Sequence, residues 1–323
     1  MAEVTMPDRP SVVILLGPTG VGKSRLAIEL AEKFGGEIIS ADSMQVYRYM
    51  DIGTAKPSRE EQKRVPHHLM DLVDPDQPFH VGLYRMLGRK KIEELHPRGK
   101  RIWVVGGTGL YIKAVTQGIF PSPEIDPSVR ERLKRDCAER GEDFLYRRLQ
   151  DVDPKTASQV HPHDLFRTLR ALEVFDSTGI PISFFRDQHR FLDRPYRTLK
   201  IGLETDRGVL YERIEQRVDQ MIERGLLQEV SRLMEMGYGP ELKPMQSLGY
   251  KQMFRYVSKE MEWDEAIRQM KRDTRRYAKR QRTWFKSDPE IHWRNEAVGR
   301  SQILEEVESF LKGGAEEHDK EPD

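Results

Sequence analysis

Cysteine is almost absent from this sequence, which has one, Cys137, among its 323 residues. A single cysteine excludes an intramolecular disulfide and any zinc module that is built on several cysteines. Long apolar runs are also lacking, and none approaches the roughly 20 residues that a membrane helix needs. The first ten residues do not show the basic and then apolar order of a secretory signal. We therefore expect a protein of the cytoplasm that does not enter a membrane.

The sequence also lacks an excess of either charge. It has 54 basic and 53 acidic residues, so the net charge says nothing about partners. Metal-binding patterns are missing too: His67 and His68 are adjacent, but no further His or Cys stands at ligand spacing. We interpret these two histidines as residues at the edge of a strand. The length predicts about two domains.

The most informative feature that is present is a phosphate-binding loop. Its pattern is G-x-x-x-x-G-K-[ST], placed between an apolar run at 12–16 and a helix-like stretch that ends at Phe34. In this setting the backbone N–H groups surround an anion, the lysine reaches the outer phosphate and the serine ligates Mg²⁺. A chance glycine-rich turn is the alternative, and both flanks argue against it. The loop predicts binding of a di- or triphosphate by Gly17, Pro18, Thr19, Gly20, Val21, Gly22, Lys23 and Ser24.

Strands, glycine-containing loops and helices alternate along the first part of the chain. Apolar runs at 12–16, 37–40 and 101–105 predict strands, 68–73 suggests a further short strand, and 81–95 predicts a helix. This alternation is typical of an α/β fold with a parallel sheet flanked by helices. Ligands of such sheets bind beyond the carboxyl ends of the strands. We therefore expect the phosphate loop, Asp42 and Thr108 to meet at one edge.

The pattern changes near Gly118, where three prolines follow within ten residues. From there to about Arg190 the sequence favours helices, and a strand pattern returns at 198. We predict an α/β core at 1–117 and 198–312 with an all-helical insertion at 118–197. The acidic tail at 313–323 lacks large apolar residues and should be disordered.

A basic stretch at 264–286 contrasts with the balanced charge of the chain. It holds nine Lys or Arg residues and three acidic ones, with Tyr277, Trp284 and Phe285 among them. The spacing of the basic residues predicts a helix. A solvated helix face with aromatic anchors in the core is one interpretation. The density of one charge sign favours contact with nucleic acid or polyphosphate.

Two polar residues next to the phosphate loop each have two possible roles. Asp42 can help to order Mg²⁺ or accept a proton beside a phosphate ester, or it can cap a turn before Ser43. Thr108 can bond a phosphate or a substrate, or it can cap the helix that follows. The position of Asp42 after a predicted strand favours the functional role.

Several longer stretches resemble the signatures of the tRNA dimethylallyltransferase family, also called tRNA isopentenyltransferases. They are the phosphate loop and residues 41–47, 50–57, 106–111, 170–174, 249–250 and 278–285, so the resemblance covers about residues 11 to 290. It implies a fold similar to P-loop kinases, with an inserted helical domain that embraces the anticodon stem. It also implies transfer of a dimethylallyl group from dimethylallyl diphosphate to N6 of adenosine 37 in tRNA. The single cysteine leaves no room for the zinc finger of eukaryotic relatives, which points to the bacterial type.

The resemblance assigns roles to individual residues. Asp42 would hold the N6 amine and take its proton, Lys23 and Thr108 would lie at the reacting centre, and Ser24 would ligate Mg²⁺. The phosphate loop would bind the leaving diphosphate, and we expect the chain to act as a monomer. Expected tRNA contacts are Asp42, Ser43, Met44, Gln45, Thr108, Phe166, Arg167, Thr168, Leu169, Arg170, Gln246, Arg275, Arg276, Lys279 and Arg280.

Three other functions fit parts of the sequence. A small-molecule P-loop kinase would use the loop for ATP, but neither an Arg-rich lid nor a Walker-B-like run ending in Asp is visible. An adenylate isopentenyltransferase would modify a free nucleotide, whereas the helical insertion and the basic helix favour a large acceptor. A non-catalytic RNA-binding protein would not need an intact set of Lys23, Ser24, Asp42 and Thr108.

Overall fold

The computed structural model describes residues 9–120, 126–189 and 193–313. They divide into two compact units, one made of the chain up to Thr116 and from Arg194 onward, the other of Gln117–Asp193. From the sequence we predicted the insertion at 118–197. Residues 194–197 belong instead to the first unit, and a strand of that unit begins at Arg197. The predicted acidic tail lies outside the described residues, apart from Gly313.

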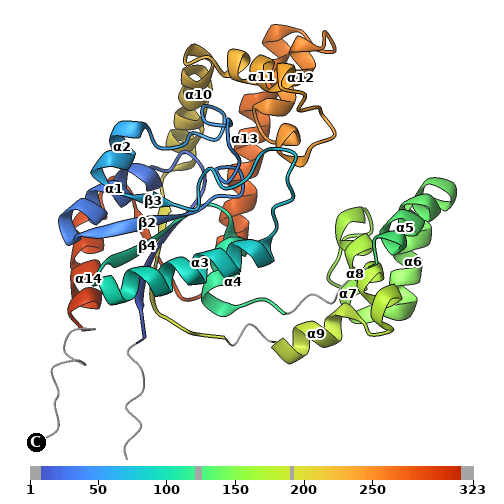
Figure 1. Ribbon diagram of the computed structural model, residues 1–323, viewed down its shortest axis with the longest axis horizontal. Helices are drawn as coiled ribbons and strands as arrows, with labels where there is room; N and C mark the ends of the chain where they lie inside the picture. The colour runs from blue at the N-terminus through green and yellow to red at the C-terminus, as the bar shows by residue number, and fades with distance from the viewer. Residues whose placement is uncertain (1–8, 121–125, 190–192, 314–323) are drawn as a thin grey trace, which may run out of the picture. The chain divides into compact units, whose positions relative to one another are not determined.

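A parallel sheet of six strands forms the centre of the first unit (Figure 1). The strand order is β3-β2-β4-β1-β5-β6, and every neighbouring pair is parallel. This arrangement confirms the predicted α/β class. The strands are β1 (Ser11–Leu16), β2 (Gly36–Ala41), β3 (His67–His68), β4 (Arg101–Gly106), β5 (Arg197–Glu204) and β6 (Ile291–Asn295).

The strand expected at 68–73 is wrong in its extent, because β3 ends at His68. Leu69 and Asp71 have φ angles of 62° and 53°, which lie in the left-handed region and cannot continue a strand. The chain instead follows residues 45–47 through backbone hydrogen bonds such as Asp71 N–H to Gln45 O at 3.1 Å.

Both faces of the sheet are covered by helices, as a parallel sheet requires. Val13 and Leu15 of β1 belong to the core shared with α1 (Lys23–Phe34) and α14 (Arg300–Lys312). Ile14 and Leu16 point the other way, into the core shared with α3 (Val81–Leu95) and α4 (Gly109–Gln117). The sheet is therefore buried on both sides, which leaves its strand ends as the place for a ligand.

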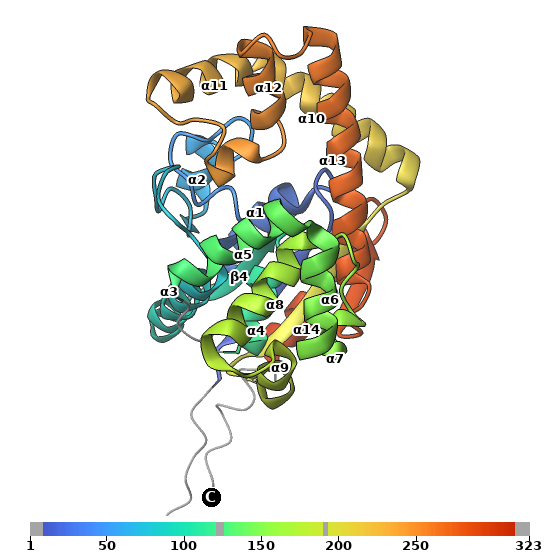
Figure 2. The ribbon, with the colours of Figure 1, turned by 90° about the vertical axis from the view of Figure 1, so that its right-hand side faces the viewer.

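Further helices of this unit gather at one end of the sheet. Figures 1 and 2 both show α11 and α12 there, while α13 runs from them toward the sheet. Phe285, the last residue of α13, is buried in the sheet core. The bounds are α2 (Arg59–Arg64), α10 (Arg207–Glu223), α11 (Leu226–Glu235), α12 (Tyr250–Val257) and α13 (Trp263–Phe285).

The second unit is helical throughout its described residues, as predicted. Its own apolar core includes Leu133, Leu145, Leu149 and Leu172. A buried carboxylate, Glu173, is stabilised by ion pairs with two arginines of the same unit. The helices are α5 (Pro127–Arg140), α6 (Glu142–Val152), α7 (Pro154–Ala157), α8 (Leu165–Thr178) and α9 (Ile182–His189).

No helix in the described parts of the chain has both the length and the apolar composition that crossing a membrane requires.

Candidate active site

A cavity of about 490 Å³ opens at the carboxyl ends of β1, β2 and β4. These strands are neighbours in the sheet, so the segments that follow them lie together: the phosphate loop after β1, Asp42 after β2 and Gly107 after β4. The edge predicted from the sequence is therefore where the cavity lies. Helices α10 and α13 contribute a further wall through Arg213, Gln216, Arg217, Gln220, Tyr277 and Gln281, and the segment after Asp42 contributes Thr54, Ala55, Pro57, Glu61 and His67.

The phosphate loop has the backbone conformation that its glycines allow. Gly20 and Gly22 have φ angles of 83° and 102°, a region that favours glycine, and Gly22 is the residue before α1. The start of α1 carries the partial positive charge of the helix and faces the cavity through Lys23 and Ser24. The Lys23 ammonium donates to the carbonyl oxygens of Gly17 and Pro18 at 3.0 and 2.8 Å.

Not every N–H group of the loop is available to an anion. The Thr19 N–H donates to Oε1 of Gln281 at 2.9 Å, and the Val21 N–H donates to Pro18 O at 3.4 Å. The loop amides that bond no described residue are left for a phosphate group. They belong to Gly20, Gly22, Lys23 and Ser24.

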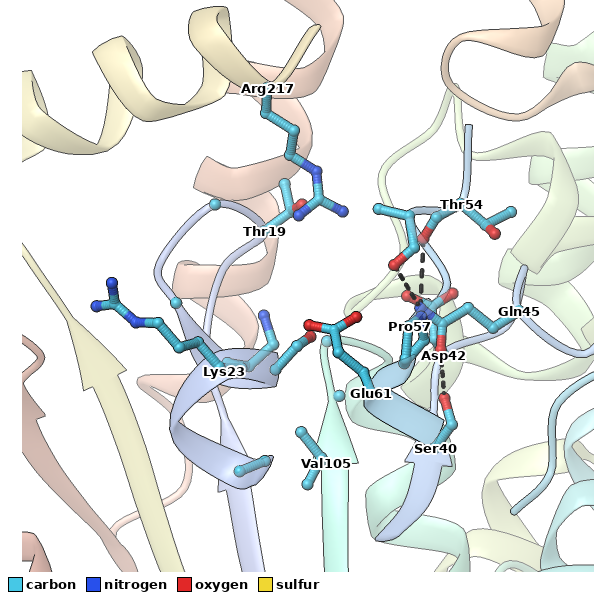
Figure 3. Close-up of a pocket in the computed structure, with 18 of the residues that line it drawn as sticks. Thr19, Lys23, Ser40, Asp42, Gln45, Thr54, Pro57, Glu61, Val105 and Arg217 are labelled. Carbon is cyan, nitrogen blue, oxygen red and sulfur yellow. Dashed lines mark hydrogen bonds between the residues drawn. The ribbon is translucent and has the colours of Figure 1, made fainter. Parts of the chain in front are cut away.

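A second cation lies on the same side of the cavity as the loop. Arg217 extends from α10 toward Thr19, and Figure 3 shows its guanidinium above the cavity. The pKa of Lys23 is lowered to about 7, chiefly by burial and also by the charge of Arg217, while Asp42 acts against the shift. Burial likewise lowers the pKa of Arg217, and Asp42 acts against it. Two desolvated cations side by side favour a strongly charged anion between them.

Asp42 stands on the wall opposite these cations (Figure 3). Its Oδ1 accepts the Met44 N–H at 2.8 Å, so the residue does cap a turn. The other carboxylate oxygen accepts no hydrogen bond from the described residues. The two interpretations of Asp42 are therefore compatible, because one oxygen orders the loop and the other is left for a ligand.

Thr108 connects the two loops of this wall. Its hydroxyl oxygen accepts the Ser43 N–H at 3.0 Å, and its N–H donates to Ala41 O at 3.1 Å. The side chain is thus bonded to the segment that carries Asp42. The backbone carbonyl oxygen of Thr108 accepts hydrogen bonds from N–H groups in the first turn of α4. This position makes Thr108 a support for Asp42.

Gln45 lines the cavity next to Asp42 and has both ends of its side chain fixed. Its Nε2 donates to the carbonyl oxygens of Thr54 and Ala55 at 3.3 and 3.4 Å, and its Oε1 accepts from Ser40 at 2.8 Å (Figure 3). The turn at 50–55 therefore determines where Gln45 lies.

That turn is held in place by a carboxylate of α11. Glu229 accepts the N–H groups of Asp51, Ile52 and Gly53 at 2.8 to 3.2 Å, together with the Tyr250 hydroxyl at 2.6 Å. Burial raises the pKa of Tyr250, and the charge of Glu229 raises it further. The phenol consequently stays a donor to Glu229 at any ordinary pH.

The basic helix is α13, and several of its cations are already paired. Lys271 and Arg275 form ion pairs with Asp219 and Glu215 of α10. Lys279 and Arg280 are exposed and pair with no acid among the described residues. Part of the charge run is therefore a helix–helix contact, and part is an accessible basic surface.

The remaining predicted tRNA contacts lie elsewhere. In α8 of the helical unit, Phe166 is 75% exposed and Arg167 is exposed, whereas Thr168 is 1% exposed. Leu169 packs against the core of that unit, and Arg170 pairs with Glu173 at 3.3 Å. Gln246 of the first unit is exposed and donates to Pro240 O.

A metal site made of protein groups alone is not found in the described residues, which hold no group of three His, Cys, Asp or Glu side chains able to share an ion. Mg²⁺ commonly uses one or two protein oxygens and completes its shell with phosphate oxygens and water. Ser24 and Asp42 both line the cavity and supply such oxygens. The donor set therefore fits Mg²⁺ bound together with a diphosphate.

Several cavity residues were not singled out from the sequence, among them Arg217 and Gln281. Arg217 lies in the middle of an amphipathic helix without a motif, and only the packing of α10 shows its role. Gln281 was seen as one letter of the stretch 278–285, with no function attached. Its position between the phosphate loop and Gly107 follows from the fold of α13.

The fold and the site define a P-loop-like α/β enzyme in which a glycine-rich loop and two cations face a carboxylate across one cavity. The model of the IPP transferase family matches residues 45–288, and that of the isopentenyl transferase family matches residues 10–71. The chain belongs to the family of tRNA dimethylallyltransferases, and this membership makes it a prenyltransferase.

Individual relatives are similar over almost the whole chain. The tRNA dimethylallyltransferase of Syntrophobacter fumaroxidans is 56% identical over 90% of this chain and 84% of its own. That of Desulfosudis oleivorans is 51% identical over 95% and 98%. The crystal structure of a tRNA isopentenylpyrophosphate transferase from Bacillus halodurans has a TM-score of 0.70 at 40% identity, covering 96% of this chain and 98% of its own. The crystal structure of a eukaryotic dimethylallyltransferase acting on tRNA has a TM-score of 0.74 at 33% identity. The match covers 89% of this chain and 74% of that one.

Proposed function

We propose that this protein transfers a dimethylallyl group from dimethylallyl diphosphate to N6 of adenosine 37 in tRNA and releases diphosphate. The observation that carries the proposal is the pair of opposite walls in one cavity. The wall with Lys23 and Arg217 is suited to the leaving diphosphate, and the wall with Asp42 is suited to an amine that must lose a proton. Membership of the family supports the choice of a prenyl donor and a tRNA acceptor.

The leaving group is the first electrostatic problem of this reaction. As the bond between C1 and the bridging oxygen breaks, its electron pair stays on the diphosphate. The loop amides and Lys23 would surround that charge from one side and Arg217 from another. Preorganised donors in a site shielded from water are the strongest means of stabilising such charge.

The acceptor is the second problem, because the lone pair of the adenine N6 amine is delocalised into the ring. N6 forms the new bond to C1 and must lose one hydrogen. Asp42 has a carboxylate oxygen that no described residue uses, and this oxygen would take the proton. Thr108, bonded to Ser43 N–H, would keep the Asp42 segment in place.

Mg²⁺ is expected as the cofactor. Ser24, at the start of α1, would supply one oxygen, with the diphosphate supplying others. When bound, the ion would neutralise part of the charge that the leaving diphosphate gains.

The tRNA must present a base that is normally stacked. Extrusion of the adenine costs a few kcal/mol, and the RNA backbone has to be held while this happens. Exposed cations of α13 and the exposed Gln246 would contact the anticodon stem-loop from the first unit. In the helical unit, the exposed Phe166 is suited to stacking on a base and Arg167 to a phosphate. We place the reaction in the cytoplasm, where tRNA is modified.

The proposal is tested by incubating the protein with Mg²⁺, labelled dimethylallyl diphosphate and either tRNA or AMP. Label in tRNA alone, with diphosphate released, supports it. Label in AMP would support the adenylate isopentenyltransferase, and hydrolysis of ATP without any prenyl transfer would support the small-molecule kinase.

A further inference from the structure

Gln281 of α13 bridges two neighbouring loops that line the cavity, the phosphate loop after β1 and the loop after β4. Its Oε1 accepts the N–H of Thr19 in the phosphate loop, and its Nε2 donates to Gly107 O, both at 2.9 Å. The residue is 7% exposed and lines the cavity. One side chain is thus bonded to the backbone of both loops.

These bonds continue toward Asp42. Gly107 precedes Thr108, whose hydroxyl oxygen accepts the Ser43 N–H at 3.0 Å. Ser43 follows Asp42 directly, and the Asp42 carboxylate is fixed through the Met44 N–H. A continuous path of hydrogen bonds and backbone therefore runs from Thr19, through Gln281, to the proposed base.

The chemistry of both bonds requires a carboxamide. The Thr19 N–H needs an acceptor and Gly107 O needs a donor, and Gln offers one of each at the end of a single side chain. A glutamate would keep the acceptor, lose the donor and place a negative charge beside the diphosphate. A methionine would keep the length and lose both bonds.

The absence of a side chain at Gly107 makes room for the carboxamide of Gln281. A Cβ atom on Gly107 would lie 2.1 Å from Gln281 Nε2, whereas the next nearest atoms are at 3.3 Å or more. Glycine at position 107 therefore allows the carboxamide to reach the carbonyl. The two residues form one fitted contact.

We propose that Gln281 is a positioning residue that sets the distance between the diphosphate cradle and the Asp42 wall. The role rests on the proposed function, because it matters only if a leaving group and an acceptor amine have to meet. Gln281 would act through Thr19 and Gly107 and would form no bond with the reacting atoms. Its loss should therefore slow the chemical step more than it weakens the binding of either substrate.

The test compares Gln281→Met with wild type under single turnover, with saturating tRNA and varied dimethylallyl diphosphate. We expect a slowing of about 10²-fold, the scale of a displacement of about 1 Å, with little change in the affinity for tRNA or for inorganic pyrophosphate. Gln269→Met is the matched control, since Gln269 lies on the same helix and bonds Glu265 at 2.8 Å. Gln281→Glu, which retains the Thr19 bond, should fold, slow the step and also raise the KM for the donor.

A second measurement uses the fitted contact. Gly107→Ala alone should slow transfer because the new methyl group displaces Nε2, but added to Gln281→Ala it should cause no further loss. Losses that multiply in the double variant would overturn the proposal, as would a normal rate in Gln281→Met or a loss explained by pyrophosphate affinity alone. Wild type tests the proposed function itself, which fails if wild type transfers no prenyl group to tRNA. If wild type is active and the variants transfer at the same rate, only the role of Gln281 is overturned.

Discussion

Arg217 of α10 lies close enough to Lys23 of the phosphate loop to lower the pKa of the lysine ammonium. The two side chains come from segments almost 200 residues apart and meet only because α10 packs over the loop. Burial and this repulsion together bring the pKa of Lys23 to about 7. A diphosphate between them would reverse the effect, because the anion favours the charged form of both side chains.

Binding of diphosphate should therefore be coupled to proton uptake by Lys23. Below pH 7 the lysine is already charged, and binding takes up no proton there. Above pH 7 it is mostly neutral in the ligand-free protein, so binding draws up to about one proton from solution and the affinity falls as the pH rises. Calorimetry with inorganic pyrophosphate at pH 8, in buffers of different ionisation enthalpy, measures this uptake. Lys23→Met should abolish it, and equal uptake in both proteins would contradict the assignment.

Arg217→Gln should weaken binding of dimethylallyl diphosphate by about 10- to 100-fold, the scale of a lost hydrogen bond to a charged group. The same substitution removes the repulsion on Lys23 and should move the pH step of pyrophosphate binding upward. Arg207→Gln is a suitable control, because Arg207 stacks on Tyr211 at the start of the same helix. An unchanged donor affinity in Arg217→Gln would remove this residue from the cradle.

The accessible cations of α13 should make tRNA binding sensitive to salt concentration. Replacing Arg276, Lys279 and Arg280 by Gln should weaken tRNA binding and flatten its dependence on salt concentration, since each phosphate contact contributes to that slope. Replacing Lys271 and Arg275 should change the slope less, because acids of α10 already compensate their charges. Titrations of tRNA at several NaCl concentrations measure both sets. An equal change in the salt dependence of both sets of variants would show that the ion pairs of Lys271 and Arg275 open when RNA binds.

Glu229 should matter for stability. Glu229→Ala leaves three N–H groups of the 50–55 turn and the Tyr250 hydroxyl without their acceptor. We expect the free energy of unfolding to fall by about 1–3 kcal/mol, measured by urea denaturation. Glu235→Ala, at an exposed position of the same helix, should change it by less than about 0.5 kcal/mol. Equal stability of both variants would show that water replaces Glu229 without loss.

The elements that the sequence predicted well are those with strong local patterns. The helix at 81–95 was expected with the bounds found, and the phosphate loop lies where its motif requires, directly before α1. The meeting of the loop, Asp42 and Thr108 followed from the rule that parallel strands end at one edge.

What the sequence did not show depends on contacts between distant segments. Strand β6 (Ile291–Asn295) is a five-residue edge strand, and the pairing of its residues with β5 defines it. Arg217 and Gln281 lie on helices whose amphipathic patterns resemble those of any surface helix. The ion pairs of Lys271 and Arg275 with α10 likewise depend on packing, so the basic helix was predicted as one surface although only part of it is accessible.

The central claim is that Asp42 takes the proton of the amine across from the diphosphate cradle. Asp42→Asn keeps an oxygen for the Met44 N–H and removes the base, so the turn should remain intact. Single-turnover transfer from labelled dimethylallyl diphosphate to bound tRNA is the direct measurement. We predict that the variant binds tRNA as wild type does and transfers the label about 10²- to 10⁴-fold more slowly. Transfer at the wild-type rate by Asp42→Asn would contradict the account.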